Sequence, residues 1–146
     1  MMEFQGTVAF AAAQTAVWHI LTTPALVSQC TPRLQGWAAL EEESQFQLQF
    51  IWGKGSSTVI IPLLLTWQTI TPPTYLQWHC QAQMGRTAVP LRGDFHLSAT
   101  ETRQTNLTFS AQLTPPNKFM GKMIQNTAPP LIEQFFNCLK KTAEAV

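Results

Sequence analysis

Alternation of apolar and polar side chains between residues 34 and 113 constrains the fold more than any other feature of this chain. In the segment 75–84 the even positions Leu76, Trp78 and Cys80 are apolar, whereas most odd positions are glutamine. A period of two is the pattern of a strand with one buried face. It recurs at 46–52, 89–97 and 107–113, and a further strand is expected at Phe4–Phe10. Turns rich in proline, glycine and polar residues separate these runs, so we expect antiparallel hairpins.

Helices are expected on both sides of these strands. Residues 17–32 are typical of a short apolar helix, a break at Pro24 and a second helical turn. From Asn117 onward, apolar residues recur four apart, as in an amphipathic helix. Pro129 and Pro130 remove two backbone donors from it, so we expect a long proline-kinked helix or two helices that meet there. Together with six or seven strands, this predicts one α+β domain over residues 1–146.

Charged residues are few and scattered. They make up 12% of the chain, the formal net charge is +1, and the lysines and arginines form no basic stripe. Because binding to phosphates needs clustered cations, nucleic acid is not an expected partner. The three histidines and three cysteines show no metal-ligand spacing, so neither a metal nor another cofactor is expected.

The cysteines and the N-terminus bear on the compartment. Cys30, Cys80 and Cys138 are odd in number and far apart, which is typical of free thiols in a reducing compartment. The N-terminus has no basic region followed by an apolar run, and the longest apolar run, 59–67, is too short to span a membrane. We therefore expect a cytoplasmic protein without a transmembrane segment.

The order of the expected elements resembles the helix-grip arrangement of the START and birch-pollen-allergen (SRPBCC) superfamily. In that arrangement a curved antiparallel sheet, with two short helices after its first strand, closes around a long C-terminal helix. Within the superfamily the chain is similar to the CoxG-like family, which takes its name from carbon monoxide dehydrogenase. The similarity covers nearly the whole chain and is carried by Val17-Trp18 through Leu21, Pro24 with Leu26, Cys30-Thr31-Pro32, Pro72-Pro73-Thr74-Tyr75 and Phe135-Phe136.

The resemblance implies a cavity between sheet and helix for a hydrophobic, lipid- or quinone-like molecule. Some relatives are associated with the maturation of molybdenum hydroxylases, which implies a redox-enzyme partner. Two departures from the family pattern are Arg33, where a glycine is usual, and Pro129-Pro130, where the helix is usually continuous. Relatives that contact the membrane use a longer C-terminal tail, whereas this sequence ends at Val146, so membrane anchoring is not expected.

The inward faces of the strands and of the long helix are the expected lining of this cavity. Alternatively, these side chains touch one another and fill the space. Cys80, Thr127 and Tyr75 are the polar groups that the pattern places near the cavity or its rim. The expected ligand-binding residues are Phe50, Trp52, Trp78, Cys80, Phe95, Leu97, Phe109 and Ala111 from the strands, with Phe119, Met120, Met123, Ile124, Thr127 and Leu131 from the helix.

The segment Val59–Leu65 is apolar at both strand phases, unlike a strand with one wet face. Its outer side is either covered by a loop or exposed as a surface for a redox enzyme or a second copy of the chain. The predicted partner-binding residues are Val59, Ile61, Leu63 and Leu65. By contrast, Glu41–Glu43 is expected to be a solvated turn.

The leading hypothesis is a binding protein for a hydrophobic small molecule, without chemistry of its own. The second is an adaptor or maturation factor for a redox enzyme. The third, a polyketide cyclase-like enzyme, requires a His, Asp, Glu or Tyr side chain that points into the cavity. Because His79 and His96 fall at outward strand phases, no catalytic residue is assigned.

Overall fold

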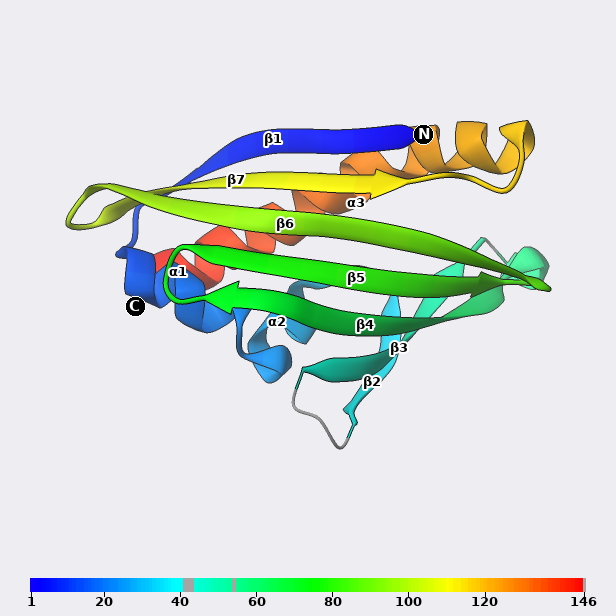
Figure 1. Cartoon of the computed structure of the whole chain (residues 1–146), viewed down its shortest axis with the longest axis horizontal. Helices are drawn as coiled ribbons and strands as arrows, with labels where there is room; N and C mark the ends of the chain where they lie inside the picture. The colour runs from blue at the N-terminus through cyan, green and yellow to red at the C-terminus, as the bar shows by residue number, and fades with distance from the viewer. Residues whose placement is uncertain (41–43, 54, 146) are drawn as a thin grey trace.

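A curved antiparallel sheet of seven strands dominates the computed structural model, which describes residues 1–40, 44–53 and 55–145 (Figure 1). The strand order is β1-β7-β6-β5-β4-β3-β2, so every consecutive pair from β2 to β7 is a hairpin and β1 pairs with β7. This confirms the expected meander. The strands are β1 (Met2–Phe10), β2 (Leu34–Ala39), β3 (Gln45–Trp52), β4 (Val59–Thr71), β5 (Tyr75–Met84), β6 (Thr87–Glu101) and β7 (Gln104–Leu113).

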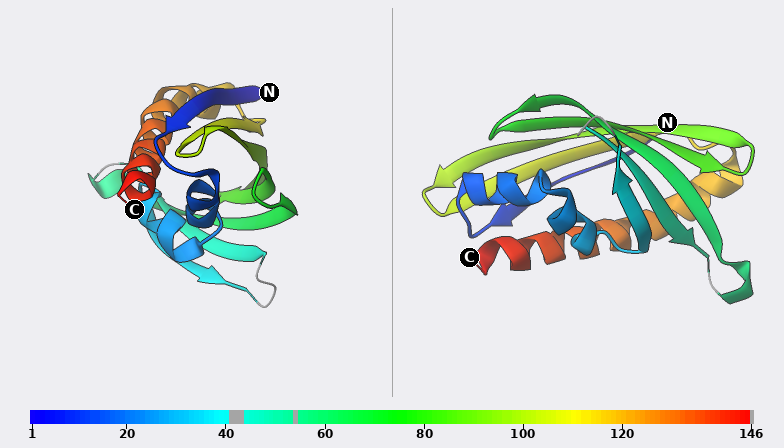
Figure 2. Two further views of the ribbon diagram at one scale, coloured as in Figure 1. Left: turned by 90° about the vertical axis from the view of Figure 1, so that its left-hand side faces the viewer. Right: turned by 90° about the horizontal axis from the view of Figure 1, so that it is seen from below.

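Three α-helices lie within the curve of the sheet in the described part of the chain. They are α1 (Gln14–Leu21), α2 (Pro24–Cys30) and α3 (Lys118–Glu144), and a short 3-10 turn, η1 (Gly55–Ser57), connects β3 to β4. Figure 2 shows the sheet curling around them, with α3 along the concave side and α1 and α2 beside its C-terminal half. The predicted α+β arrangement, with two short helices after the first strand and a long closing helix, is confirmed.

Strand alternation sorts the side chains as expected in β5. Leu76 and Cys80 are 1% and 6% exposed, whereas Gln81 and Gln83 on the other phase are exposed. The apolar phase therefore faces the helices, and the glutamine-rich phase faces solvent. The expected acidic turn Glu41–Glu43 lies outside the described residues.

The buried core is divided into two clusters, and α3 contributes to both. One cluster surrounds Phe136 and Leu139, which pack with Phe10 and Leu107 and with α1. The other surrounds Ile124, which packs with Leu113 and other residues of β4 to β7. The helix thus lies mainly along the β1, β7 and β6 side of the sheet, and it meets β4 at Ile61 in the second cluster.

Pro129 and Pro130 lie inside one continuous helix. The alternative of two helices that meet there is therefore wrong. Asn117 caps the first turn, since its side-chain oxygen accepts a hydrogen bond from the Met120 N–H at 2.8 Å. The two prolines deprive the carbonyls of Gln125 and Asn126 of their helical partners, but both residues are exposed, so water can take that place.

A disulfide joins Cys30 at the end of α2 to Cys138 on α3. Their Cα atoms are 5.3 Å apart although 108 residues separate them in the sequence. The prediction of three free thiols is thus wrong for this pair, and Cys80 alone is a free cysteine in the described part of the chain. The pairing arises from the packing of α2 against α3, which no local spacing pattern reveals.

Candidate ligand-binding cavity

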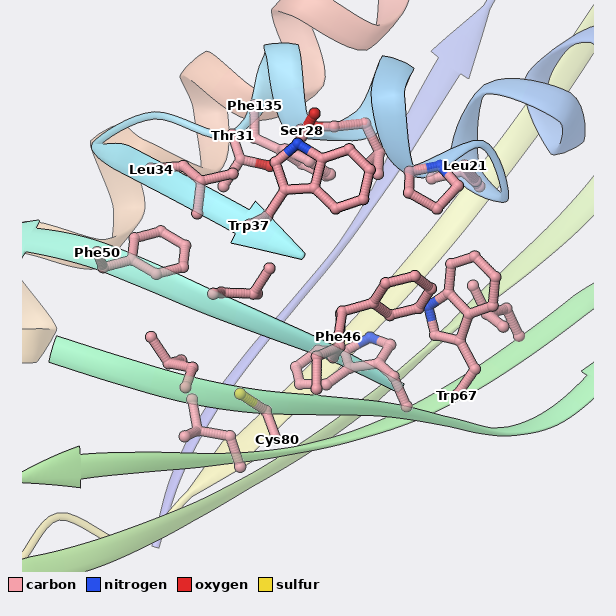
Figure 3. Close-up of a pocket in the computed structure, with 18 of the residues that line it drawn as sticks. Leu21, Ser28, Thr31, Leu34, Trp37, Phe46, Phe50, Trp67, Cys80 and Phe135 are labelled. Carbon is pink, nitrogen blue, oxygen red and sulfur yellow. The ribbon is translucent and has the colours of Figure 1, made fainter. Parts of the chain in front are cut away.

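A cavity of about 260 Å³ lies between α2 and the inner face of the sheet (Figure 3). Its walls come from the end of α1, from α2, from strands β2 to β6 and from one residue of α3. The lining residues are Leu21, Pro24, Val27, Ser28, Thr31, Leu34, Trp37, Phe46, Leu48, Phe50, Leu63, Leu65, Trp67, Leu76, Trp78, Cys80, Leu91, Phe95 and Phe135.

The inward-facing residues of β3, β4, β5 and β6 form the floor of the cavity, which is its sheet side. In β3 these residues are Phe46, Leu48 and Phe50, and successive members lie two positions apart. The registers of β3 with β4 and of β4 with β5 place the inward residues of neighbouring strands side by side, as at Leu65 and Cys80. The alternation seen in the sequence therefore builds a continuous apolar floor.

Gly93 on β6 makes room for the Trp78 indole, one of the largest parts of this floor. The two residues are direct partners across β5 and β6. A Cβ atom at Gly93 would overlap with the Ser110 carbonyl oxygen and would lie 2.8 Å from Trp78 Cε2. The absence of a side chain at Gly93 therefore lets the indole lie against the strand. The Trp78 Nε1 atom is buried and has no hydrogen-bond partner among the described residues.

Helix α2 covers the floor with one face. Pro24 stands at the first helical turn, where its missing N–H costs nothing, and Val27 and Ser28 follow on the same face. Thr31, the residue after the end of the helix, continues this side of the cavity. Ser28 Oγ donates to the Ala25 carbonyl at 3.1 Å, and Thr31 Oγ1 donates to the Val27 carbonyl at 2.8 Å. The disulfide at Cys30 holds this helix to α3.

The cavity reaches solvent beside β2. Trp37 is 39% exposed, and all other lining residues are half-buried or buried. In Figure 3 Trp37 lies on the α2 side of the cavity, away from Cys80 on the floor. We therefore place the mouth at Trp37, where a molecule entering from solvent first meets the lining.

No charged side chain is among the described residues that line the cavity. Its one ionisable group is the Cys80 thiol, and burial raises the pKa of that thiol from 9.0 to about 12. At neutral pH the sulfur is therefore a protonated thiol. A thiol in this state is a poor nucleophile and a poor metal ligand.

Cys80 is expected to resist alkylation in the folded protein. With its pKa near 12, the thiolate fraction at pH 8 is negligible, and iodoacetamide should label Cys80 only after unfolding. Because the pKa is about 9 in the unfolded chain and about 12 in the folded one, unfolding releases a proton between these values, so stability falls as pH rises above 9. Mass spectrometry after labelling with and without urea measures the first effect, and rapid labelling of the folded protein at pH 8 would contradict it.

Four of the residues expected to bind the ligand lie on the cavity wall, namely Phe50, Trp78, Cys80 and Phe95. The others lie elsewhere, because α3 packs along the β1 side of the sheet while α2 covers the floor. Phe119 is 75% exposed. Leu97 and Phe109 pack in the cluster around Phe136, Trp52 and Ile124 pack in the second cluster, and Ala111, Met120, Met123, Thr127 and Leu131 are half-buried outside the cavity lining.

The apolar run of β4 is divided between the two faces of the sheet. Ile61 is buried in the second core cluster, and Leu63 and Leu65 line the cavity, so these three predicted partner-binding residues face inward. Val59, at the start of the strand, is 52% exposed. The outer phase carries Ile60 and Leu64, which are 55% and 41% exposed. No loop among the described residues buries them.

Tyr75, which the strand pattern predicts near the cavity or its rim, lies instead on the outer face of the sheet, at the outward phase that also carries His79 and His96. The Tyr75 hydroxyl donates to Asp94 Oδ2 at 3.3 Å, and its ring contacts His96 with centroids 4.5 Å apart. Burial and the Asp94 carboxylate raise the pKa of Tyr75. Within residues 1–40, 44–53 and 55–145 no group of three or more His, Cys, Asp or Glu side chains is arranged to hold a metal ion. In the same ranges, no helix has the length and hydrophobicity needed to cross a membrane.

Sequence reasoning missed the α2 and β2 side of the cavity. A signal for it exists, because Pro24, Val27, Ser28 and Thr31 follow the i, i+3, i+4, i+7 spacing of one helical face. The face is small and partly polar, so it does not stand out as an apolar stripe. Trp37 carries no such signal, since β2 alternates only weakly.

Comparison with known proteins identifies the fold. No family model matches the sequence, and no curated protein matches it. Solved structures do match over nearly the whole chain. A conserved protein from Geobacillus kaustophilus is 20% identical, with a TM-score of 0.82, and the match covers 96% of this chain and 93% of that one. A START superfamily protein from Mycobacterium smegmatis is 18% identical, with a TM-score of 0.71 and coverage of 98% and 97%.

An enzyme shares the same architecture. The Zhui aromatase/cyclase from Streptomyces sp. R1128 is 14% identical, with a TM-score of 0.70, and the match covers 98% of this chain and 93% of that one. The chain therefore has the helix-grip fold of START superfamily proteins. At these identities the likeness establishes the fold alone, and the resemblance to the CoxG-like family stays a prediction.

Proposed function

We propose that this protein binds a neutral, hydrophobic small molecule in the cavity beneath α2 and does no chemistry of its own. The observation that carries the proposal is an apolar, aromatic-lined cavity with a mouth at Trp37 and no charged residue among the described residues of its lining. Sites for small molecules are concave and mostly apolar, with a few polar groups that fix orientation. The inward-facing Phe50, Trp78, Cys80 and Phe95 belong to this proposed site, together with residues from α2.

The size of the cavity limits the guest. A volume of about 260 Å³ is just below the usual ~300–1,000 Å³ of ligand pockets. A quinone-like ring system therefore fits the proposal better than a lipid with long acyl chains.

Hydrophobic burial alone gives weak binding of such a guest. Removing about 300 Å² of apolar ligand surface from water contributes about 8 kcal/mol. The loss of translational and rotational freedom costs at least about 4 kcal/mol. The remaining ~4 kcal/mol corresponds to a Kd of about 1 mM, so tighter binding needs aromatic contacts or a hydrogen bond.

A binding role is favoured over a cyclase-like enzyme because of what lines the cavity. An acid/base mechanism needs a group that titrates near neutral pH within reach of the substrate. The described lining contains no carboxylate, imidazole or phenol, and its thiol has a pKa of about 12. Tyr75, His79 and His96 belong to the outward phases of β5 and β6.

A variant that fills the cavity tests the proposal. Leu65→Trp places an indole in the space, so it should weaken the binding of 2-methoxynaphthalene, a neutral two-ring probe, at least tenfold. Leu64→Trp is the matched control, because the neighbouring residue faces outward and is 41% exposed. Isothermal titration calorimetry and the ligand-induced rise in melting temperature measure both variants. Equal binding to the two variants, or no binding to the wild-type protein, would sink the proposal.

An adaptor role for a redox enzyme is the second candidate. The exposed Ile60 and Leu64 form an apolar strip on the outer side of β4, opposite the cavity, and the exposed Val59 begins the same strand. An exposed apolar strip is a feature of protein-binding surfaces. This role and ligand binding use opposite faces of one strand, so the two are compatible.

A further inference from the structure

The α2 side of the cavity differs in chemistry from the sheet side, which forms its floor. Ser28 of α2 and Thr31, the residue that follows the end of this helix, bring two hydroxyl groups to the lining. In Figure 3 they lie together with Trp37 at one end, away from Phe46 and Cys80 at the other. Seven aromatic side chains supply much of the remaining wall: Trp37, Phe46, Phe50, Trp67, Trp78, Phe95 and Phe135. A guest therefore meets a polar patch on α2 and ring faces elsewhere.

The two hydroxyl groups can only accept hydrogen bonds from a guest. Each hydroxyl has a single proton, and both protons are already used within the helix. Ser28 Oγ donates to the Ala25 carbonyl at 3.1 Å, and Thr31 Oγ1 donates to the Val27 carbonyl at 2.8 Å. What remains on each oxygen is lone-pair capacity, which calls for a donor on the ligand.

The lack of charge among the described residues of the lining restricts which donor the ligand can carry. An ammonium group would enter a site without an anionic partner, and a carboxylate or phosphate would bring further acceptors to an acceptor patch. A neutral O–H group avoids both costs. Its oxygen can also accept from an indole N–H, so the tryptophans of the wall do not oppose it.

We propose that the ligand is a neutral aromatic alcohol, whose hydroxyl group donates to Ser28 Oγ or Thr31 Oγ1 while its ring lies against the aromatic floor. This inference rests on the proposed function, because it names the class of molecule that the same cavity takes. Flat rings fit a wall of aromatic faces, and offset or edge-to-face contacts add to the affinity. The mouth at Trp37 admits such a molecule from solvent.

Two probes that differ only at the oxygen test this class. In 2-naphthol the oxygen carries a proton, and in 2-methoxynaphthalene it carries a methyl group. A purely hydrophobic cavity prefers the ether, which has the additional methyl group. The proposal predicts the opposite, with about tenfold tighter binding of 2-naphthol by calorimetry at pH 7, the upper end of the usual net effect of one hydrogen bond.

Variants of Ser28 and Thr31 test whether their hydroxyl groups cause the preference for 2-naphthol. In the double variant Ser28→Ala with Thr31→Val the ratio of the two affinities should fall from about tenfold in favour of 2-naphthol to one or less. Thr22→Val is the matched control, since Thr22 Oγ1 donates to the Trp18 carbonyl at 2.8 Å in the same way but Thr22 does not line the cavity. This control should keep the tenfold preference.

The possible failures are distinguishable. If the wild-type protein binds the ether as tightly as 2-naphthol or more tightly, the proposal that the ligand is an aromatic alcohol is wrong, but the proposed binding of a hydrophobic molecule stands. The inference also falls if the double variant keeps the preference, because the hydroxyl group is then recognised elsewhere. If neither probe binds, the proposed function itself is overturned.

Discussion

Replacing both Cys30 and Cys138 by alanine is expected to lower the free energy of unfolding by about 4 kcal/mol. The bridge closes a loop with a sequence separation of 108 residues, and in the chain-entropy account a loop of about 100 residues gives close to 4.7 kcal/mol. Most of this effect acts on the unfolded chain, which gains conformational freedom when the link is lost. Denaturation by guanidinium chloride, followed by circular dichroism, measures the difference.

Chemical reduction provides the control for this prediction. A phosphine reductant should lower the stability of the wild-type protein to that of the double variant and leave the variant itself unchanged. Cys80 has no bridge, so it gives no reductant effect of its own. If the wild-type protein in oxidised and reduced form unfolds at the same denaturant concentration, the bridge has no role in stability and the prediction fails.

The bridge also matters for the cavity, because α2 is a short helix. Seven residues are too few for a helix that holds itself by its own hydrogen bonds. The covalent link at Cys30 therefore helps to keep Val27, Ser28 and Thr31 over the floor. Disulfides are usual in oxidising compartments, so the bridge removes one of the two arguments for a cytoplasmic location, which stays a prediction.

Strand phase was readable from the sequence, but the position of the cavity was not. Alternation correctly separated Leu76 and Cys80 from Gln81 and Gln83, because period two follows directly from strand geometry. It does not say which inward residues meet a helix and which face a gap. That depends on where α3 crosses the sheet, so Ile124 fills a core cluster whereas Phe50 lines the cavity.

The roles of the apolar residues in β4 could not be predicted for the same reason. The sequence showed that both phases are apolar but not which one is turned inward. The register with β3 and β5 settles it, since Leu65 pairs with Phe46 on one side and with Cys80 on the other. All three are cavity residues, so Leu63 and Leu65 line the ligand site and Ile60 and Leu64 are left to the outer surface.

Gly93 is the residue at which stability and the shape of the cavity are most closely coupled. A Cβ atom there would overlap with the Ser110 carbonyl oxygen on β7 and with the Trp78 indole on β5, and neither the paired backbone nor the half-buried ring, packed in the cavity wall, moves freely. Gly93→Ala is therefore expected to destabilise the fold by about 2–3 kcal/mol, the upper part of the ~1–3 kcal/mol range of overpacked sites. Because the displaced indole is part of the cavity floor, binding of 2-naphthol should also weaken.

Gly36→Ala serves as the matched control for Gly93→Ala, because Gly36 also lies in a strand but a Cβ atom there would meet only Gln49 Oε1, at 3.6 Å. This ordinary contact predicts a change within about 0.5 kcal/mol. Adding Trp78→Phe to Gly93→Ala removes the part of the indole that overlaps the new methyl group. It should recover some of the lost stability, although the overlap with the Ser110 carbonyl remains. Guanidinium denaturation of the four proteins measures these differences. Equal stability of Gly93→Ala and Gly36→Ala would contradict the prediction. It would show that strand β6 can shift to accommodate a methyl group at residue 93, so that the position of Trp78 does not require a glycine there.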